Sequence, residues 1–106
     1  MNVDEQLDHA AEALEAWDGA TPRALGPALD RLERLILEAQ ASGTKAAGRL
    51  QSWLSLTAVG AVTLAGLIDL AGQLEGESAA EAHFAGARLR DVVGALADQT
   101  AACLAS

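Results

Sequence analysis

The chain has 106 residues, of which 51% are apolar, and its 15 acidic and 7 basic side chains give a formal charge of −8. The length corresponds to one domain spanning residues 1–106, and the apolar content excludes a disordered tail. The negative charge argues against direct nucleic-acid binding through neutralised phosphates. Ala and Leu dominate while aromatic residues make up 3%, which favours helices over strands.

The first predicted helix covers residues 3–17. Its apolar side chains recur at intervals of four and three residues, which places them on one stripe of a helix: Val3, Leu7, Ala10, Leu14 and Trp17. Asn2 is the predicted N-cap, with Glu5 as its capping-box partner. The pair Asp18-Gly19 supplies the stop signal.

The second predicted helix begins at Gly26 or Pro27 and ends near Gln40. Pro27 would break a helix that started at Pro22, so we expect only a short turn over residues 22–25. The apolar stripe of this helix has the same spacing as the first, and Leu35 widens it: Leu25, Leu29, Leu32, Ile36 and Ala39.

The third predicted helix covers residues 44–74, with Thr44 as its N-cap. From Leu54 to Gly72 nearly every residue is apolar or small, and Asp69 is the only charge. A helix that is apolar all round is buried on all sides or lies in lipid, and this stretch is long enough to cross a bilayer. We favour buried core over a membrane span, because the stripes of the other helices need a surface to pack against.

The fourth predicted helix opens on a capping box from Ser78 to Glu81 and runs to about Leu104. We expect it to form a long antiparallel hairpin with the third helix, on which the two shorter helices pack. The predicted fold class is therefore all-α, a four-helix bundle. The predicted core draws on the last three helices: Leu29, Leu32, Ile36, Leu64, Leu67, Leu89, Val93 and Leu96.

Candidate partner-binding residues come from two patterns. Six acidic residues and no Lys or Arg lie within the first 18 positions; such a run favours the helix N-terminal dipole, and it also offers a face to a basic partner. Glycines and alanines of the third helix would let another helix approach closely. The candidates are Asp4, Asp8, Glu12, Glu15, Gly60 and Gly66.

Known catalytic and metal-binding patterns are not found in the sequence. It holds no Glu-x-x-His pair of the kind that di-iron bundles use, no glycine-rich phosphate loop, and a single cysteine, Cys103. Neither His9 nor His83 has a sequence neighbour that suggests a triad. We therefore predict no enzymatic activity, no cofactor and no metal. The acidic, polar N-terminus does not resemble a secretory signal, so we expect a cytoplasmic protein.

These observations favour a non-enzymatic protein-binding module, such as a small intracellular inhibitor, antitoxin-like partner or adaptor, with a protein partner that is basic if the acidic face binds it. One alternative is a small membrane-inserting protein with residues 54–72 as its span. Another is an acidic nucleic-acid mimic that blocks a basic site. A third helix of thirty residues would reach about 45 Å, more than the shorter helices cover, so we expect a homodimer or an obligate hetero-complex.

Overall fold

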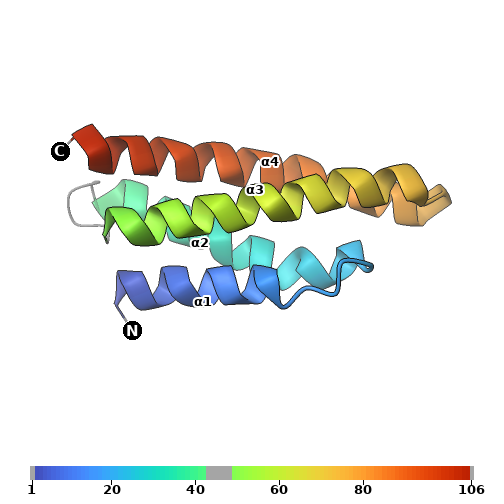
Figure 1. The fold of residues 1–106 in the computed structure, drawn as a ribbon, viewed down its shortest axis with the longest axis horizontal. Coiled ribbons are helices and arrows are strands. Elements are labelled where there is room, and N and C mark those ends of the chain that lie inside the picture. The colour runs from blue at the N-terminus through green and yellow to red at the C-terminus, as the bar shows by residue number, and fades with distance from the viewer. Residues whose placement is uncertain (1, 43–48, 106) are drawn as a thin grey trace.

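The computed structural model describes residues 2–42 and 49–105 and confirms the all-α bundle, with no strand in that part of the chain. Its helices are α1 (Val3–Glu15), α2 (Gly26–Ser42), α3 (Leu50–Gln73) and α4 (Gly76–Ala105), and a 3-10 turn, η1 (Pro22–Leu25), precedes α2. The molecule measures 45 × 24 × 20 Å. The predicted hairpin of α3 and α4 runs along its length, with α1 and α2 packed on it (Figure 1).

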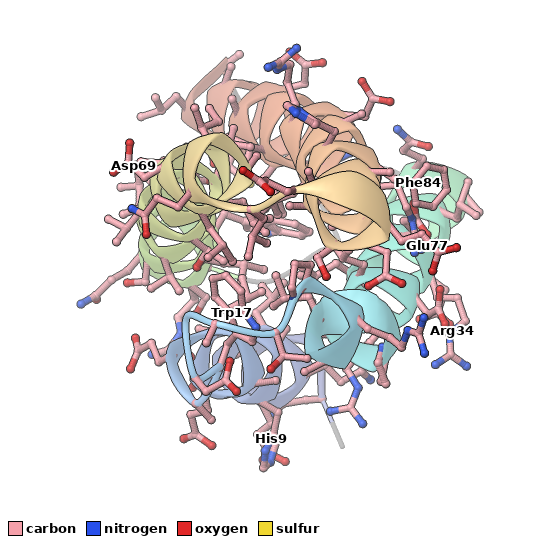
Figure 2. All side chains as sticks on the ribbon, turned by 90° about the vertical axis from the view of Figure 1, so that its right-hand side faces the viewer. His9, Trp17, Arg34, Asp69, Glu77 and Phe84 are labelled. Carbon is pink, nitrogen blue, oxygen red and sulfur yellow. The ribbon has the colours of Figure 1, made fainter. Side chains whose placement is uncertain are left out.

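Seen along the bundle, the four helices occupy the corners of a square in the order α1, α3, α4, α2 (Figure 2). Two sets of ion pairs connect neighbouring corners. Asp4 at the start of α1 meets Arg49 at the start of α3, and Arg88 of α4 meets Asp30 and Glu33 of α2. In this arrangement every helix packs against two neighbours and turns its remaining side outward.

Local signals in the sequence account for the start of α1 and for the turn that follows it. The Asn2 side chain accepts a hydrogen bond of 2.8 Å from the Glu5 backbone N–H, as expected for the N-cap of α1. Asp18 closes the turn after α1 by accepting hydrogen bonds from the backbone N–H groups of Ala20 and Thr21. Gly19 has a φ of +75°, a conformation that glycine adopts readily.

The start of α4 differs from the sequence prediction. The helix begins at Gly76, two residues before Ser78, so Ser78 lies inside the helix and is not its cap. Gly76 has a φ of +63°, so the chain can turn directly from α3 into α4. Glu81 forms an ion pair with Arg23 of η1 instead of closing a capping box. Thr44, the predicted cap of the third helix, falls outside the described residues.

The core lies between the four helices, and the predicted positions supply much of it. The predicted side chains that are buried come from α2, α3 and α4: Leu29, Leu32, Ile36, Leu67, Leu89 and Leu96. Leu64 and Val93 are only partly buried and pack against this cluster. The largest fully buried side chain, Trp53, was not among the predicted core residues. Its indole lies near the start of α3, where that helix packs on α1.

Candidate functional site

Helix α3 has one buried face and one exposed face. Trp53, Leu56 and Leu67 on the inner side are fully buried. On the other side, apolar side chains that recur every three or four residues are exposed, and we call them the outer face of α3: Leu54, Ala58, Ala61, Val62, Ala65 and Ile68. Only 28% of the most apolar 18-residue window of this helix is buried. The expectation that residues 54–72 are buried on all sides is therefore wrong.

The square arrangement explains why the outer face stays uncovered. Helix α3 packs against α4 on one side and α1 on the other, while α2 lies at the diagonal corner (Figure 2). With 13 residues against 24, α1 is also too short to follow α3 to its end. Sequence periodicity cannot find the buried side of such a helix, because both of its sides are apolar.

A groove of about 490 Å³ runs between the end of α1 and the outer face of α3. Ala58, Val62 and Gly66 line it from α3, and Glu15 and Trp17 line it from α1 and the turn that follows. Figure 2 shows Trp17 lying between these two helices. The groove is thus continuous with the apolar outer face through Ala58 and Val62.

Trp17 is held in place at the end of this groove. Its indole Nε1 donates a hydrogen bond of 2.8 Å to the carbonyl oxygen of Thr21. Its ring carbon Cζ3 lies 4.0 Å from the place that a Cβ on Gly66 would occupy, so the glycine lets the ring lie close to the α3 backbone. Gly66 was predicted as a partner-binding residue, and the structure places it in the groove.

The other predicted glycine, Gly60, faces inward. It is buried, and a Cβ at this position would lie 3.1 Å from Cγ2 of Val93 on α4. Its small size serves the close packing of α3 on α4 within the molecule. The structure therefore removes Gly60 from the partner-facing surface, because the side of α3 on which it lies is already covered.

The predicted acidic residues of α1 occupy different environments. Asp4 accepts a hydrogen bond of 2.8 Å from the Arg49 backbone N–H, which is the main reason that its pKa lies below the usual range. Glu12 lies 3.7 Å from the ring of His9, which points away from the bundle in Figure 2. Asp8 and Glu15 border the space between α1 and α3 and have no ion-pair partner in residues 2–42 and 49–105.

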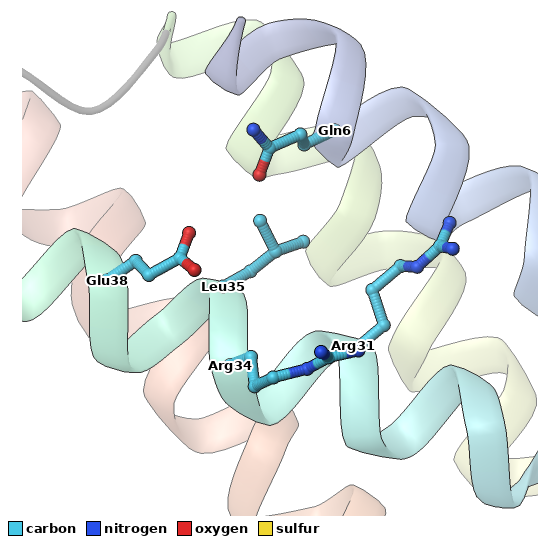
Figure 3. A pocket seen from close by; sticks show the side chains of 5 residues that line it. All are labelled: Gln6, Arg31, Arg34, Leu35 and Glu38. Carbon is cyan, nitrogen blue, oxygen red and sulfur yellow. The ribbon is translucent and has the colours of Figure 1, made fainter. Parts of the chain in front are cut away.

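A second, smaller pocket of about 250 Å³ lies between α1 and α2 (Figure 3). Arg31 and Arg34 line it together with Gln6, Leu35 and Glu38. The two guanidinium groups are exposed and form no ion pair within the described part of the chain, whereas Arg88 bridges two carboxylates of α2. Neither arginine was predicted as a site residue, since two Arg side chains on one helix face carry no sequence signal that separates a binding site from a solvated surface.

Arg88 is a structural residue. Its guanidinium donates hydrogen bonds to Glu33 and, at 2.8 Å, to Asp30, and these contacts raise the pKa of the Arg88 side chain. The Arg88 side chain is 25% exposed, whereas its partners Asp30 and Glu33 are more exposed to water. Arg88 thereby connects α4 to α2 by charge.

No group of three or more His, Cys, Asp or Glu side chains with metal-binding geometry occurs among the residues that the structure describes. His83 is exposed, and Cys103 is partly buried near the end of α4. The sequence matches no protein-family model, and comparisons with curated proteins and with solved structures find no similar protein. The most distinctive surface features are thus the outer face of α3 and the groove beside it.

Proposed function

We propose that this chain is a non-enzymatic, cytoplasmic protein-binding module, such as an inhibitor, antitoxin-like partner or adaptor, and that its partner packs on the outer face of α3. One observation carries the proposal: Leu54, Val62 and Ile68 are 48, 74 and 53% exposed on one side of one helix. A contiguous apolar patch on a soluble protein commonly marks an interaction site, because association removes that surface from water.

The groove beside this face adds to the support. Binding energy in protein interfaces concentrates in a few well-placed side chains, among which Trp is enriched. Trp17 is a rigid, partly exposed indole whose polar N–H is already satisfied by Thr21. A partner that covers Val62 and the Trp17 ring would bury both without leaving an indole donor unpaired.

The test is site-specific photo-cross-linking in the cells that produce the protein. A benzophenone amino acid replaces Ala58 on the outer face of α3 or, as a matched control, Asp98 on the exposed side of α4. We expect discrete protein adducts from position 58 that are lost when Val62→Glu is added, and none of these adducts from position 98. Equal adduct patterns at both positions, or no protein adduct at position 58, would contradict the proposal.

The exposed apolar face also supports a second candidate, a small membrane-inserting protein. Helix α3 is the one helix in the described part of the chain that is long and apolar enough to cross a membrane, with a mean hydropathy of 1.8 in its best window. Such a role requires the bundle to open, because Trp53, Leu56 and Leu67 of the same helix are packed in the core. Retention in the membrane pellet after alkaline carbonate extraction would favour this candidate over the first.

The acidic side chains keep a third candidate in consideration, a nucleic-acid mimic that blocks a basic site. Asp8 and Glu15 are exposed and unpaired within residues 2–42 and 49–105, as such a mimic requires. Asp4, by contrast, is held by Arg49, and Arg88 meets two carboxylates of α2. Salt-sensitive competition with DNA for a basic partner is the measurement that would favour the mimic.

A further inference from the structure

We infer that the groove between α1 and α3 receives an amphipathic helix of the partner protein, one whose apolar stripe is flanked by two cationic side chains seven residues apart. This inference rests on the proposed function and names the chemistry of the partner segment. Its observations are the shape and the apolar wall of the groove, Glu15 at the edge of the groove, and Asp8 two turns earlier on α1, in a neighbouring pocket between the same two helices. Neither carboxylate has an ion-pair partner within residues 2–42 and 49–105.

The backbone of the groove walls favours a helix as the occupant. Residues 50–73 of α3 and 3–15 of α1 are continuous helix, so their backbone N–H and C=O groups are hydrogen-bonded within each helix, apart from the terminal turns. An extended peptide gains its affinity from main-chain hydrogen bonds to an open sheet edge, which these walls do not offer. A helix laid in an apolar groove binds through side-chain packing alone.

The α3 wall of the groove supplies the apolar contact. Ala58 and Gly66 are small and exposed, and Val62 projects between them at 74% exposure. Small residues on both sides of one projecting valine let a facing helix come close and pack around that side chain. Trp17 bounds the groove at the end where α1 has stopped.

The α1 rim sets the charge that the partner must carry. Asp8 and Glu15 are both exposed and lie along the α3 side of α1, where Asp8 borders Ser55 and Glu15 borders Val62. Among the described residues, Arg49 lines the same small pocket as Asp8, and its guanidinium pairs with Asp4. Seven residues correspond to two helical turns, about 10 Å, so a helix lying alongside α1 meets both carboxylates with Lys or Arg at the same seven-residue interval.

A second copy of this chain lacks the required pattern. None of its seven Lys and Arg residues lies seven positions from another. Each copy would also bring a formal charge of −8 to a face that is bordered by carboxylates. The pattern therefore points to a different, basic protein segment and away from self-association.

The probe for the test is a fluorescently labelled Leu/Ala helix of about 15 residues with two lysines seven positions apart. A control peptide has one lysine moved by two positions, which turns it about 200° around the helix. Fluorescence anisotropy measures binding at low and at physiological salt. We expect the probe to bind at least about tenfold more tightly than the control peptide, and to shift the emission of Trp17 to shorter wavelength as its ring becomes covered.

Matched protein variants separate the groove from general attraction to an acidic surface. Glu15→Lys and Val62→Glu should each weaken probe binding about tenfold. The first removes a carboxylate that pairs with a lysine of the probe, and the second removes the central apolar contact. Asp98→Lys and Leu104→Glu change the charge by the same amounts at exposed positions of α4, at the corner diagonally opposite α1, and should leave affinity within about twofold. Circular dichroism of all four variants confirms folding.

Three outcomes would overturn the inference: no probe binding up to about 1 mM, equal binding of both peptides, or equal loss in the groove and α4 variants. Sedimentation that shows a dimer dissociated by Val62→Glu, or flotation of the protein with lipid vesicles, would do the same by assigning the face to another occupant. If the probe peptide fails in one of these ways but cross-linking at position 58 still yields protein adducts in cells, the proposed function stands. Only the inferred charge and helical form of the partner segment would then be rejected.

Discussion

Arg88 of α4 forms the ion pairs that connect α4 to α2. It contacts Asp30 and Glu33, both of which are partly exposed to water, so solvent screens the pair. We expect Arg88→Met to lower the free energy of unfolding by about 1 kcal/mol, measured by urea titration. Arg90→Met is the matched control, because Arg90 is exposed and forms no ion pair within the described residues, and it should change stability by less than about 0.5 kcal/mol. Equal effects would show that the bridge contributes nothing.

Asp18 gives the protein a pH-dependent stability. Backbone N–H groups of Ala20 and Thr21 donate to its carboxylate and lower its pKa below the ordinary value for Asp. A lowered folded-state pKa stabilises the fold above the pKa of the unfolded chain, and this contribution is lost as the pH falls through the folded-state pKa. We expect Asp18→Asn to be less stable than wild type at neutral pH and to converge with it in acid. A difference that grows on acidification would contradict this cause.

Two helical glycines should respond differently to the same substitution by alanine. Alanine favours a helix over glycine by about 1 kcal/mol, and at Gly94 a Cβ would meet nothing within 4 Å. At Gly60 the added carbon would lie 3.1 Å from the Val93 side chain. Gly94→Ala should therefore raise the melting temperature, and Gly60→Ala should gain less or lose stability. A larger gain at position 60 would mean that Val93 moves aside freely.

At the scale of one helix, the two faces of α3 should differ sharply in what their side chains contribute. Leu67 is fully buried, whereas Ile68, the next residue, is 53% exposed. Leu67→Ala should cost about 2–5 kcal/mol of unfolding free energy through lost burial and a cavity. Ile68→Ala should cost less than about 1 kcal/mol, because its side chain is half in water already. Chemical denaturation of both variants decides whether the outer face is free.

At the scale of the whole molecule, added salt should favour association between two copies of this chain and should weaken binding of a basic helix. Two copies that each carry −8 repel one another, and added salt screens that repulsion. We expect sedimentation equilibrium at micromolar concentration to show a 10.8 kDa monomer at low salt, and any weak self-association at higher salt to be unaffected by Val62→Glu. Binding of a basic helix should instead weaken with salt. A dimer that is tightest at low salt would favour the homodimer alternative.

The sequence by itself determined the fold class and most of the elements. The stripes that contain Leu7 and Leu29 both face the core, because a regular interval of three and four residues places those side chains on one side of a helix. The N-cap Asn2 and the 3-10 turn at Pro22 were likewise readable, since caps and prolines act through local backbone geometry. Of the proposed site, the sequence also offered the acidic Asp8 and Glu15 and the small Gly66 as candidates, and their role in binding stays a prediction.

Only the tertiary structure decided which of these candidates share a surface. Gly60 and Gly66 look alike in sequence, yet one packs on Val93 and the other borders Trp17. Asp4 and Asp8 lie one turn apart, yet only Asp4 meets Arg49 as an ion pair. The physical reason is that α3 is apolar on every side, so its own periodicity does not choose a buried face. That choice depends on where α1 and α4 lie around it, which is a property of the assembled bundle.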